Sequence, residues 1–547
     1  MTGKRTATSD LWWKNAVIYC LDVQTFLDAD GDGRGDLVGL TERIDYLAGL
    51  GVTCLWLMPC YPSPERDDGY DISDFYAIDE RLGTLGDFAE MLRTAQDRGI
   101  RVIIDLVVNH TSHRHRWFAS ARKGRDAPYH DYYVWADERP DTPEQLVFPG
   151  EETSNWAWCE ESGQWYFHRF YAEQPDLDTA NPAVRDEIAK IGAFWLALGV
   201  VGYRIDAVPF LLEEVSGPAG EHKDPHALVR ELGRFLTRRR GDAVLLGEVN
   251  LPYDKAVEFF GVAGDELNMM FNFPLNQAMY LALARQDATP IAKTLESMPD
   301  IPSECQWANF VRNHDELSLD QLTDDERAEV FETFGPSEDV QVYGRGLRLR
   351  LPTMVDHDEA RIRLVYSLMF SMPGTPTLFY GEEIGMAENL AIPGRLSSRS
   401  PMQWSTAPHA GFSPAPEGAR LSRPAPEGAR LSRPVPDDVS ANVTDQRRDP
   451  DSLLNWMERL IRQRKECPEL GWGEVTVLHA EGPLLAHRCE WDGLAVVAVH
   501  NLSGADAKLT LSLACDRLQG LLGAEDHTPG DELTIGPYGY RWYRLTT

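Results

Sequence analysis

The sequence predicts an α/β fold: a (β/α)8 TIM barrel with a small domain inserted after the third strand and a C-terminal all-β sandwich domain. Up to about residue 465, continuous apolar runs alternate with amphipathic helical segments, the pattern of a parallel sheet covered on both faces. One long polar and aromatic segment interrupts this alternation. After about residue 468, short strands with alternating hydrophobicity replace it, which indicates a separate β domain.

The alternating elements follow each other in a regular order along the first half of the chain. The expected strands are Ala16–Tyr19, Thr53–Met58, Arg101–Val108, Leu198–Ile205 and Ala243–Gly247, and the expected helices are residues 39–50, Leu85–Arg98, 183–197 and His226–Arg239. Parallel strands of a barrel end at the same mouth. We therefore expect the functional side chains where the strands end.

The remaining segments set the expected domain boundaries. Residues 111–178 are too long for an ordinary loop and indicate an inserted domain, whose aromatic residues suit either sugar stacking or a small core. The expected division is a disordered lead-in (1–11), the barrel (12–110 and 179–466), the inserted domain (111–178) and the C-terminal domain (467–547), whose expected strands are Leu484–Cys489, Leu494–His500, Lys508–Leu513 and Tyr540–Leu545. The unit PAPEGARLSR occurs twice between residues 414 and 433, and its Pro and Gly content predicts an exposed loop without an assigned function.

Composition restricts the class of partner. A formal net charge of −33 argues against binding to nucleic acid or to an anionic membrane surface. The eight cysteines form no C-x-x-C pair, which favours free thiols in a reducing compartment over a zinc site. No apolar run is long enough to span a membrane, and the first residues lack the apolar core of a signal peptide. We expect a cytoplasmic protein that binds neither nucleic acid nor membrane.

An Arg-x-Asp motif closes the strand that ends near residue 205. Residues two apart in a strand point to the same side, so Arg204 and Asp206 should project together. A neighbouring guanidinium keeps a carboxylate ionised, as a nucleophile requires, although an isolated pair of this kind is more often structural. Other strand ends add Asp105 and His110, Glu248, and His314 with Asp315. Several acids and imidazoles at one mouth favour acid–base and nucleophilic chemistry on a glycoside.

An acidic loop follows the first strand. Asp28, Asp30, Asp32 and Asp36 have the spacing of a calcium loop, and Gly33 occupies the sharp turn. The carboxylate that closes an EF-hand is missing, because Gly39 holds that position. We expect a divalent cation here, with a merely acidic turn as the alternative.

Five motifs in order along the chain resemble those of the α-amylase family, glycoside hydrolase family 13. They are Asp105–His110, Gln174–Asp178, Gly202–Asp206, Glu248 and Asn313–Asp315, and the likeness extends from about Trp12 to the C-terminus. The resemblance implies an enzyme without an organic cofactor that acts on α-glucosides such as maltose, trehalose and maltooligosaccharides. It is compatible with a homo-oligomer.

The resemblance also implies a role for each matching residue. Asp206 would be the nucleophile, Glu248 the general acid and then base, and Asp315 the stabiliser of the transition state. Arg204 would orient Asp206 and leave Glu248 less compensated, with a raised pKa. The residues implied to bind or support the sugar are Asp67, Tyr70, Asp105, His110, Arg204, His314 and Arg399. The implied ligands of a structural divalent cation, calcium or alternatively magnesium, are Asp28, Asp30, Asp32, Asp36 and the carbonyl of Arg34.

Within the family, the chain is most similar to the trehalose synthases, which interconvert maltose and trehalose, and to the oligo-1,6-glucosidase branch. The likeness is carried by Tyr132–Trp135, Phe379–Met386, Arg399–Trp404 and the residues around Asp206 and Asp315. Ala207 resembles members that prefer α-1,4 linkages. Residues 387–398 differ from the trehalose synthases near the expected acceptor site, which leaves a hydrolase that releases glucose or short oligosaccharides open. An inactive carbohydrate-binding subunit is the alternative from another functional class.

Overall fold

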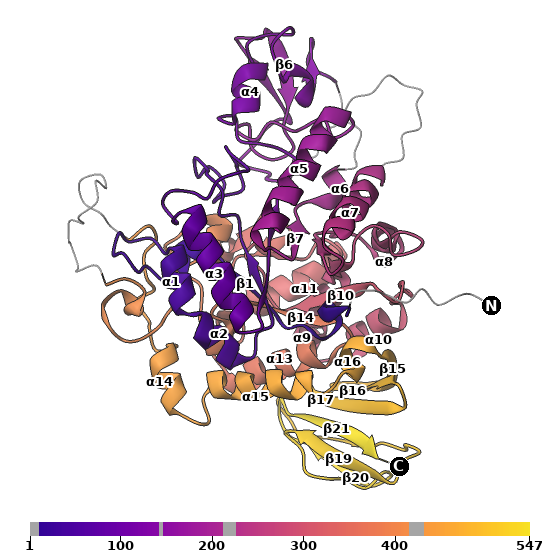
Figure 1. The fold of residues 1–547 in the computed structure, drawn as a ribbon. Helices are drawn as coiled ribbons and strands as arrows, with labels where there is room; N and C mark the ends of the chain where they lie inside the picture. The colour runs from indigo at the N-terminus through magenta and orange to yellow at the C-terminus, as the bar shows by residue number, and fades with distance from the viewer. Residues whose placement is uncertain (1–9, 142–145, 212–225, 415–430, 547) are drawn as a thin grey trace.

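A closed barrel of eight parallel strands forms the centre of the protein (Figure 1). The computed structural model describes residues 10–141, 146–211, 226–414 and 431–546. Around the barrel the strand order is β1-β14-β10-β9-β8-β7-β3-β2. The strands are β1 (Ile18–Leu21), β2 (Cys54–Leu57), β3 (Arg101–Leu106), β7 (Gly202–Ile205), β8 (Val244–Gly247), β9 (Met269–Phe271), β10 (Gln306–Phe310) and β14 (Thr375–Phe379). The predicted barrel is confirmed.

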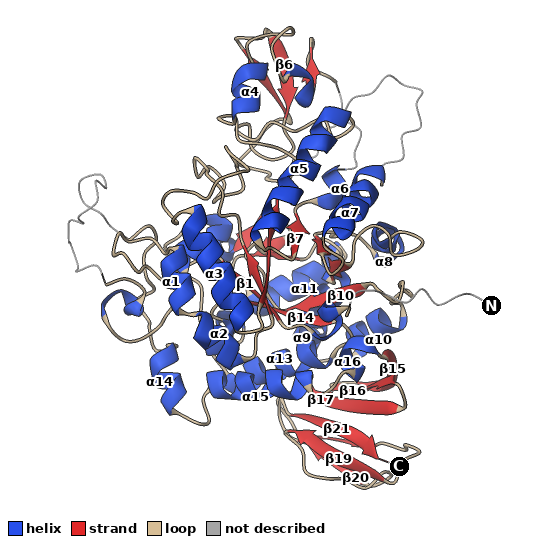
Figure 2. Ribbon diagram, in the orientation of Figure 1, coloured by secondary structure: helices blue, strands red, loops and turns tan. Residues whose placement is uncertain are grey.

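Helices surround this barrel (Figure 2). The longer ones are α3 (Leu85–Asp97), α5 (Pro182–Leu198), α7 (Ala227–Arg239), α9 (Phe273–Arg285), α10 (Thr289–Glu296), α11 (Asp324–Phe334), α13 (Glu359–Ser371) and α15 (Leu453–Lys465). The shorter helices in the barrel part are α1 (Leu37–Glu42), α2 (Ile44–Leu50), α6 (Val208–Leu211), α8 (Tyr253–Ala256), α12 (Leu351–Met354), α14 (Val443–Arg448) and α16 (Glu469–Trp472).

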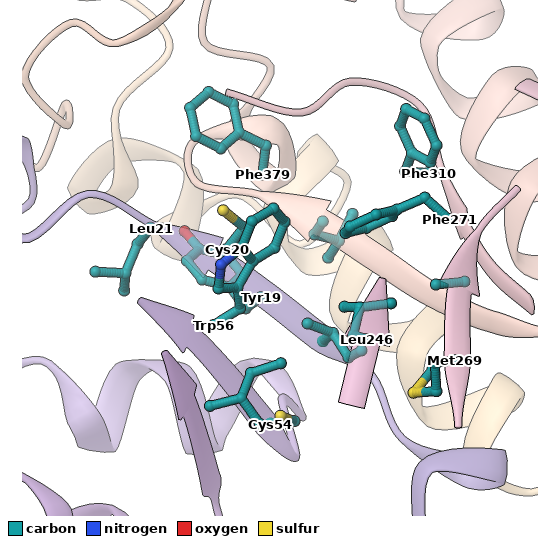
Figure 3. Packing of buried hydrophobic residues seen from close by; sticks show 14 of the residues in the cluster. Tyr19, Cys20, Leu21, Cys54, Trp56, Leu246, Met269, Phe271, Phe310 and Phe379 are labelled. Atoms are coloured by element: carbon teal, nitrogen blue, oxygen red, sulfur yellow. The ribbon is translucent and has the colours of Figure 1, made fainter. Parts of the chain in front are cut away.

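The barrel interior is a packed core. Large side chains from different strands meet there, and the ring centroids of Trp56 and Phe271 lie 5.3 Å apart (Figure 3). Tyr19 and Leu246 are also fully buried among them. Because side chains fill the barrel, space for a substrate lies at its mouth, beyond the strand ends.

Two expected elements of the barrel part differ from the structure. The helix expected over residues 39–50 is divided into α1 and α2 at Arg43, whose φ and ψ of −102° and 2° are not helical. The strand expected from Leu198 begins only at Gly202, because α5 continues to Leu198 and ends at Gly199 with a φ of 124°. Val200 and Val201 are buried although they precede the strand, and a short apolar run does not distinguish a helix end from a strand.

A small sheet lies above the barrel within the expected inserted segment. Its three strands are ordered β4-β6-β5, and they are β4 (Trp135–Ala136), β5 (Trp156–Cys159) and β6 (Gln164–Phe167), preceded by α4 (Arg116–Ala121). Val134, Trp156 and Phe167 form a hydrophobic cluster of their own, separate from the barrel core. These aromatics thus serve packing, the second of the two expected uses. The domain boundaries stay predictions.

The C-terminal part is a β sandwich, as predicted. A five-stranded antiparallel sheet has the order β15-β16-β17-β21-β19, and a two-stranded sheet pairs β18 with β20. Val497 and Val499 of one sheet pack with Leu509 and Ile535 of the other. The strands are β15 (Glu474–Glu481), β16 (Leu484–Trp491), β17 (Leu494–Asn501), β18 (Ala507–Thr510), β19 (Arg517–Leu522), β20 (Glu532–Ile535) and β21 (Tyr540–Thr546). The strand expected over Lys508–Leu513 is therefore too long.

Two expectations concern segments at the limits of the described residues. Most of the expected lead-in lies outside them, but Leu11 is buried, so the lead-in ends earlier than expected. Residues 415–430 of the duplicated segment also lie outside, whereas its last residue, Arg433, is only 8 % exposed. The expectation of an exposed loop is thus wrong at Arg433. Among the described residues, no helix has both the length and the apolar character needed to cross a membrane.

Candidate active site

Arg204, at the end of β7, joins three carboxylates from three neighbouring strands. Its Nη1 lies 2.6 Å from Asp105 Oδ1 and 2.5 Å from Asp206 Oδ1, and its Nη2 lies 2.6 Å from Glu248 Oε2. The Arg204 side chain is 1 % exposed. Strands β3, β7 and β8 are adjacent in the barrel, so one buried guanidinium reaches all three acids and fixes their orientation.

The contact between Arg204 and Glu248 corrects one expectation. The sequence predicted that Glu248 is less compensated than Asp206, yet Arg204 donates to both. Glu248 Oε2 also accepts the backbone N–H of Ala207 at 3.1 Å. Ala207 has a φ of 47°, a strained backbone conformation for a residue with a Cβ. The strain thus lies directly beside the two carboxyl groups expected to react.

Burial raises the pKa of both carboxyl groups that are expected to react. It raises the pKa of Glu248 to about 7 and that of Asp206 to about 6, while the positive charge of Arg204 opposes both changes. Of the two groups Glu248 has the higher pKa, which favours its protonated form. A retaining glycosidase needs one protonated and one ionised carboxyl group, and this order of pKa values provides it.

Asp315, beyond β10, lies among three cationic or polar side chains. Its Oδ1 is 2.8 Å from Arg395 Nη1 and 2.8 Å from Arg399 Nη2, and its Oδ2 is 3.0 Å from His314 Nε2. These neighbours hold the pKa of Asp315 well below its usual range despite burial. Burial lowers the pKa of His314 to about 4, so this imidazole is neutral at pH 7. Asp315 is consequently a fixed negative charge at the mouth of the barrel.

The segment after β2 and the end of β3 contribute further side chains beside His314 and Asp315. Tyr70 donates or accepts a hydrogen bond at 2.8 Å with His314 and stacks on its ring, with an interplanar angle of 6°. His110 Nε2 lies 3.1 Å from the Tyr70 carbonyl. Gln174 Nε2 donates to Asp67 Oδ2 at 3.1 Å, and this bond connects the inserted segment to the segment after β2.

These side chains surround one cavity of about 460 Å³, a size typical of small-molecule sites. Six of the predicted residues line it: Asp67, Tyr70, His110, Asp206, Glu248 and Asp315. Four lie behind them as supports: Asp105, Arg204, His314 and Arg399. The structure therefore brings all ten predicted residues to one place, in two layers.

Arg395 is a lining residue that the sequence did not single out. It contacts the carboxylates of both Asp67 and Asp315, and its guanidinium carbon lies 4.7 Å from the centre of the Phe148 ring. It comes from residues 387–398, the segment that differs from the trehalose synthases. The sequence feature that could have identified Arg395 is its spacing of four residues from Arg399. In the structure both arginines contact Asp315.

A roof segment, residues 146–148 of the inserted part, covers one side of the cavity. Arg345, in the turn between β12 (Gln341–Val342) and β13 (Gly346–Leu347), donates to the Val147 carbonyl at 2.9 Å and pairs with Glu316 at 3.3 Å. Glu316 itself precedes β11 (Leu317–Ser318), which pairs with β13. Phe148 packs on Tyr171, with ring centroids 4.7 Å apart. Arg345 thus connects the roof segment to the small sheet β11-β13-β12.

The acidic loop brings three of its four aspartates together. One carboxylate oxygen each of Asp28, Asp30 and Asp36 lies within 4.8 Å of the others. Asp32 lies outside this group and accepts the Arg34 N–H at 2.8 Å. Oxygen donors at this spacing fit a hard cation such as calcium. The loop is part of the chain between β1 and α1 and none of its residues lines the cavity.

Comparison with known proteins agrees with the family that the sequence motifs resemble. The family described as "Alpha amylase, catalytic domain" matches residues 21–334 and 348–473. A trehalose synthase of Pimelobacter is 38 % identical over 98 % of this chain and 96 % of its own length, and a trehalose synthase/amylase of Mycobacterium tuberculosis is 38 % identical over 98 % and 90 %. The crystal structure of a trehalulose synthase with Tris superimposes with a TM-score of 0.78 at 26 % identity, covering 98 % of this chain and 100 % of that one. The chain belongs to the α-amylase family.

Proposed function

We propose that the enzyme interconverts maltose and trehalose, with some hydrolysis to glucose, by a retaining mechanism on α-glucosides. The observation that carries this proposal is the roof over the cavity, held by Arg345 to the Val147 carbonyl. Isomerisation requires that released glucose stays in the site while water is excluded. A cavity of about 460 Å³, with residues 146–148 along one side, is of disaccharide scale and favours that outcome over a long groove for glucans.

In the first half of the proposed reaction the glycosidic bond of maltose breaks. Asp206, as the carboxylate, attacks C1 of the non-reducing glucosyl unit and forms a covalent ester. Glu248 gives its proton to the glycosidic oxygen, so the second glucose leaves as a neutral alcohol. Asp315, a permanent negative charge, stabilises the positive charge that develops on the sugar ring.

In the second half the released glucose returns in another orientation. Its anomeric hydroxyl attacks C1 of the ester, Glu248 takes the proton from that hydroxyl, and Asp206 leaves as the carboxylate. The product is trehalose, and two inversions at C1 leave the configuration α. If water attacks in place of glucose, the result is hydrolysis.

The other predicted residues have supporting roles in this proposal. Asp67, Tyr70 and His110 line the cavity where the glucosyl unit would bind. Arg204 orients Asp206 and Glu248, and Asp105 is the third acid on its guanidinium. His314 and Arg399 orient Asp315.

A structural divalent cation bound by Asp28, Asp30 and Asp36 is part of the proposal. It would stabilise the loop before α1, away from the reacting groups. The test is thermal unfolding with and without a chelator. D30N should remove the effect of the chelator on the melting temperature, whereas D32N, the matched control outside the group, should leave it. A melting temperature of the native chain that is insensitive to chelator would refute the cation.

Cytoplasmic location is also proposed, and it is supported by the state of the cysteines. All eight are free, and seven of them are buried.

Product analysis on maltose, without an added acceptor, tests the proposed activity. The proposal expects trehalose as the main product and glucose as the minor one, and no product from D206A. Glucose alone would favour the hydrolase. No reaction with any α-glucoside by the native chain would favour the inactive binding subunit.

A further inference from the structure

Arg433, the last residue of the second PAPEGARLSR unit, lies in buried surroundings behind the candidate active site. Its Nη1 donates to the backbone carbonyl of Arg399 at 2.7 Å, and its Nη2 contacts the carboxylate of Asp68. We propose that Arg433 is a positioning residue for Asp315 that acts through Arg399, and that one copy of the repeated unit is enough to supply it. This inference rests on the proposed role of Asp315.

A chain of buried contacts connects Arg433 to Asp315. Asp68 accepts from Arg433 on Oδ1 and, at 2.5 Å, from Arg399 Nη1 on Oδ2. The Arg399 side chain is fully buried, and its Nη2 lies 2.8 Å from Asp315 Oδ1. Arg399 Nε also donates to the His314 carbonyl at 2.8 Å. Asp68 thus holds the guanidinium of Arg399, and Arg433 holds its backbone carbonyl.

The charges explain why Arg433 matters to this arrangement. Asp22 lies 3.7 Å from Arg433 Nη1, so the buried carboxylates Asp22 and Asp68 face the guanidiniums of Arg399 and Arg433. Loss of Arg433 would leave Asp68 with Arg399 as its sole close guanidinium among the described residues. The buried carboxylates Asp22 and Asp68 would then be less compensated, and the backbone carbonyl of Arg399 would lose the bond that holds it. Both changes would shift the Arg399 guanidinium from its place beside Asp315.

The repeated unit offers the same local sequence twice. Leu-Ser-Arg-Pro occurs at residues 421–424 and again at 431–434. Ser413 Oγ donates to Asp28 Oδ2 at 2.6 Å, and Ser432 N donates to the carbonyl of Gly33 in the same loop at 2.8 Å. Asp28 Oδ2 also accepts the N–H of Gly33 at 2.8 Å. Ser413 and Ser432, which lie on either side of residues 415–430, are therefore both bonded to the same part of the acidic loop.

Because Ser413 and Ser432 bond to the same loop, the segment between them can be shorter than it is. Removal of one unit would leave six residues between Pro414 and the retained Leu-Ser-Arg, because residues 415–430 would shorten by ten. Six residues reach up to roughly 20 Å, and loop closure depends only weakly on length. The shortened chain can therefore still place an arginine against Asp68.

Four variants test the proposal through kcat and KM on maltose, together with the melting temperature. R433A should lower kcat by about 10- to 100-fold, the effect of a displaced catalytic group, with a much smaller change in KM. R433K keeps the charge but cannot make both contacts, and its kcat should lie between those of R433A and the native chain. R423A, the matched control in the same Leu-Ser-Arg-Pro context, and deletion of residues 414–423 should each keep kcat within about twofold.

The outcomes separate this inference from the proposed function. A folded R433A with native kcat overturns the positioning role, and an inactive deletion variant overturns the sufficiency of one copy. If R433A does not fold, R433K decides: a native kcat in R433K then refutes the proposal. If the native chain does not act on maltose, the isomerase proposal fails, and the same comparison is made on hydrolysis of 4-nitrophenyl α-glucoside, which also needs Asp315.

Discussion

Arg395 Nη1 lies 2.8 Å from Asp315 Oδ1, and the other terminal nitrogen of Arg395 contacts Asp67. One arginine thus bridges the two carboxylates that would bind the glucosyl unit, and it lines the cavity itself. In the proposed mechanism this bridge would limit the space beyond the terminal glucosyl unit.

R395A should lower kcat/KM on maltose by about 10- to 100-fold, because a charge-assisted contact contributes roughly 1.5–3 kcal/mol. It should also raise the rate on maltotriose relative to maltose, since the end of the cavity opens. Initial rates on both sugars check this. R93A, at an exposed position of α3, is the control, and an unchanged sugar preference in R395A would contradict the closing role.

The pH profile should report the two carboxyl groups on Arg204. In the proposed mechanism, activity needs Asp206 ionised and Glu248 protonated. It should fall as pH drops through about 6, where Asp206 gains its proton, and as pH rises through about 7, where Glu248 loses its own. The profile of kcat/KM on maltose checks the two limbs. A profile flat from pH 5 to 9 would refute the assignment of these groups.

R345A should change the products more than the rate of glycosidic cleavage. Without Arg345 the roof loses its bond at Val147, water enters more easily, and the ratio of glucose to trehalose rises. Chromatography of the products from maltose measures the ratio. R348A is unsuitable as a control because Arg348 holds the Ile392 carbonyl near Arg395, so R361A on α13 is used. An unchanged ratio in R345A would mean that the roof does not control water.

Two stacked histidines should make the contact between the β sandwich and α13 sensitive to acid. His487 Nε2 bonds to the Ser371 carbonyl at 2.9 Å and His500 Nε2 to Ser367 Oγ at 3.0 Å. Burial lowers the pKa of His487 to about 4 and holds that of His500 well below its usual range. Both folded-state values lie below the unfolded value of about 6.5, so their contribution is complete above that pH and is lost as pH falls towards 4.

The measurement is the melting temperature between pH 7.5 and 4.5. H500N should reduce the loss on acidification by roughly 2 °C or more, although it lowers stability at neutral pH. H357Q, at an exposed position, should follow the native curve. Parallel curves for H500N and the native chain would show that the buried imidazoles do not set the acid limit.

Most of the barrel could be predicted from the sequence, and so could the meeting of the candidate reacting groups at one place, for a physical reason. Strand ends such as Ile205-Asp206 and Gly247-Glu248 are local patterns, in which an apolar run stops at a carboxylate. Barrel closure then brings together what each strand end carries. The start of β7 was mistaken because the short apolar run Leu198–Val201 suits a helix end as well as a strand. In the structure α5 ends at Gly199, which has a φ of 124°.

Contacts between distant loops could not be predicted in this way. Arg395 reaches Asp67 across 328 positions, and Arg433 reaches Asp68 across 365. No periodicity encodes such pairs. The same holds for the shared contact of Arg204 with Glu248, which overturned the expectation that Glu248 is less compensated.

Isotope dilution tests the central claim most directly. Unlabelled maltose is converted in the presence of excess ¹³C-glucose, and the label in the trehalose formed is measured by mass spectrometry. If the released glucose stays under the roof and is joined again, trehalose remains almost unlabelled at early times. Trehalose labelled in proportion to the free glucose pool, or glucose as the sole product, would contradict the account.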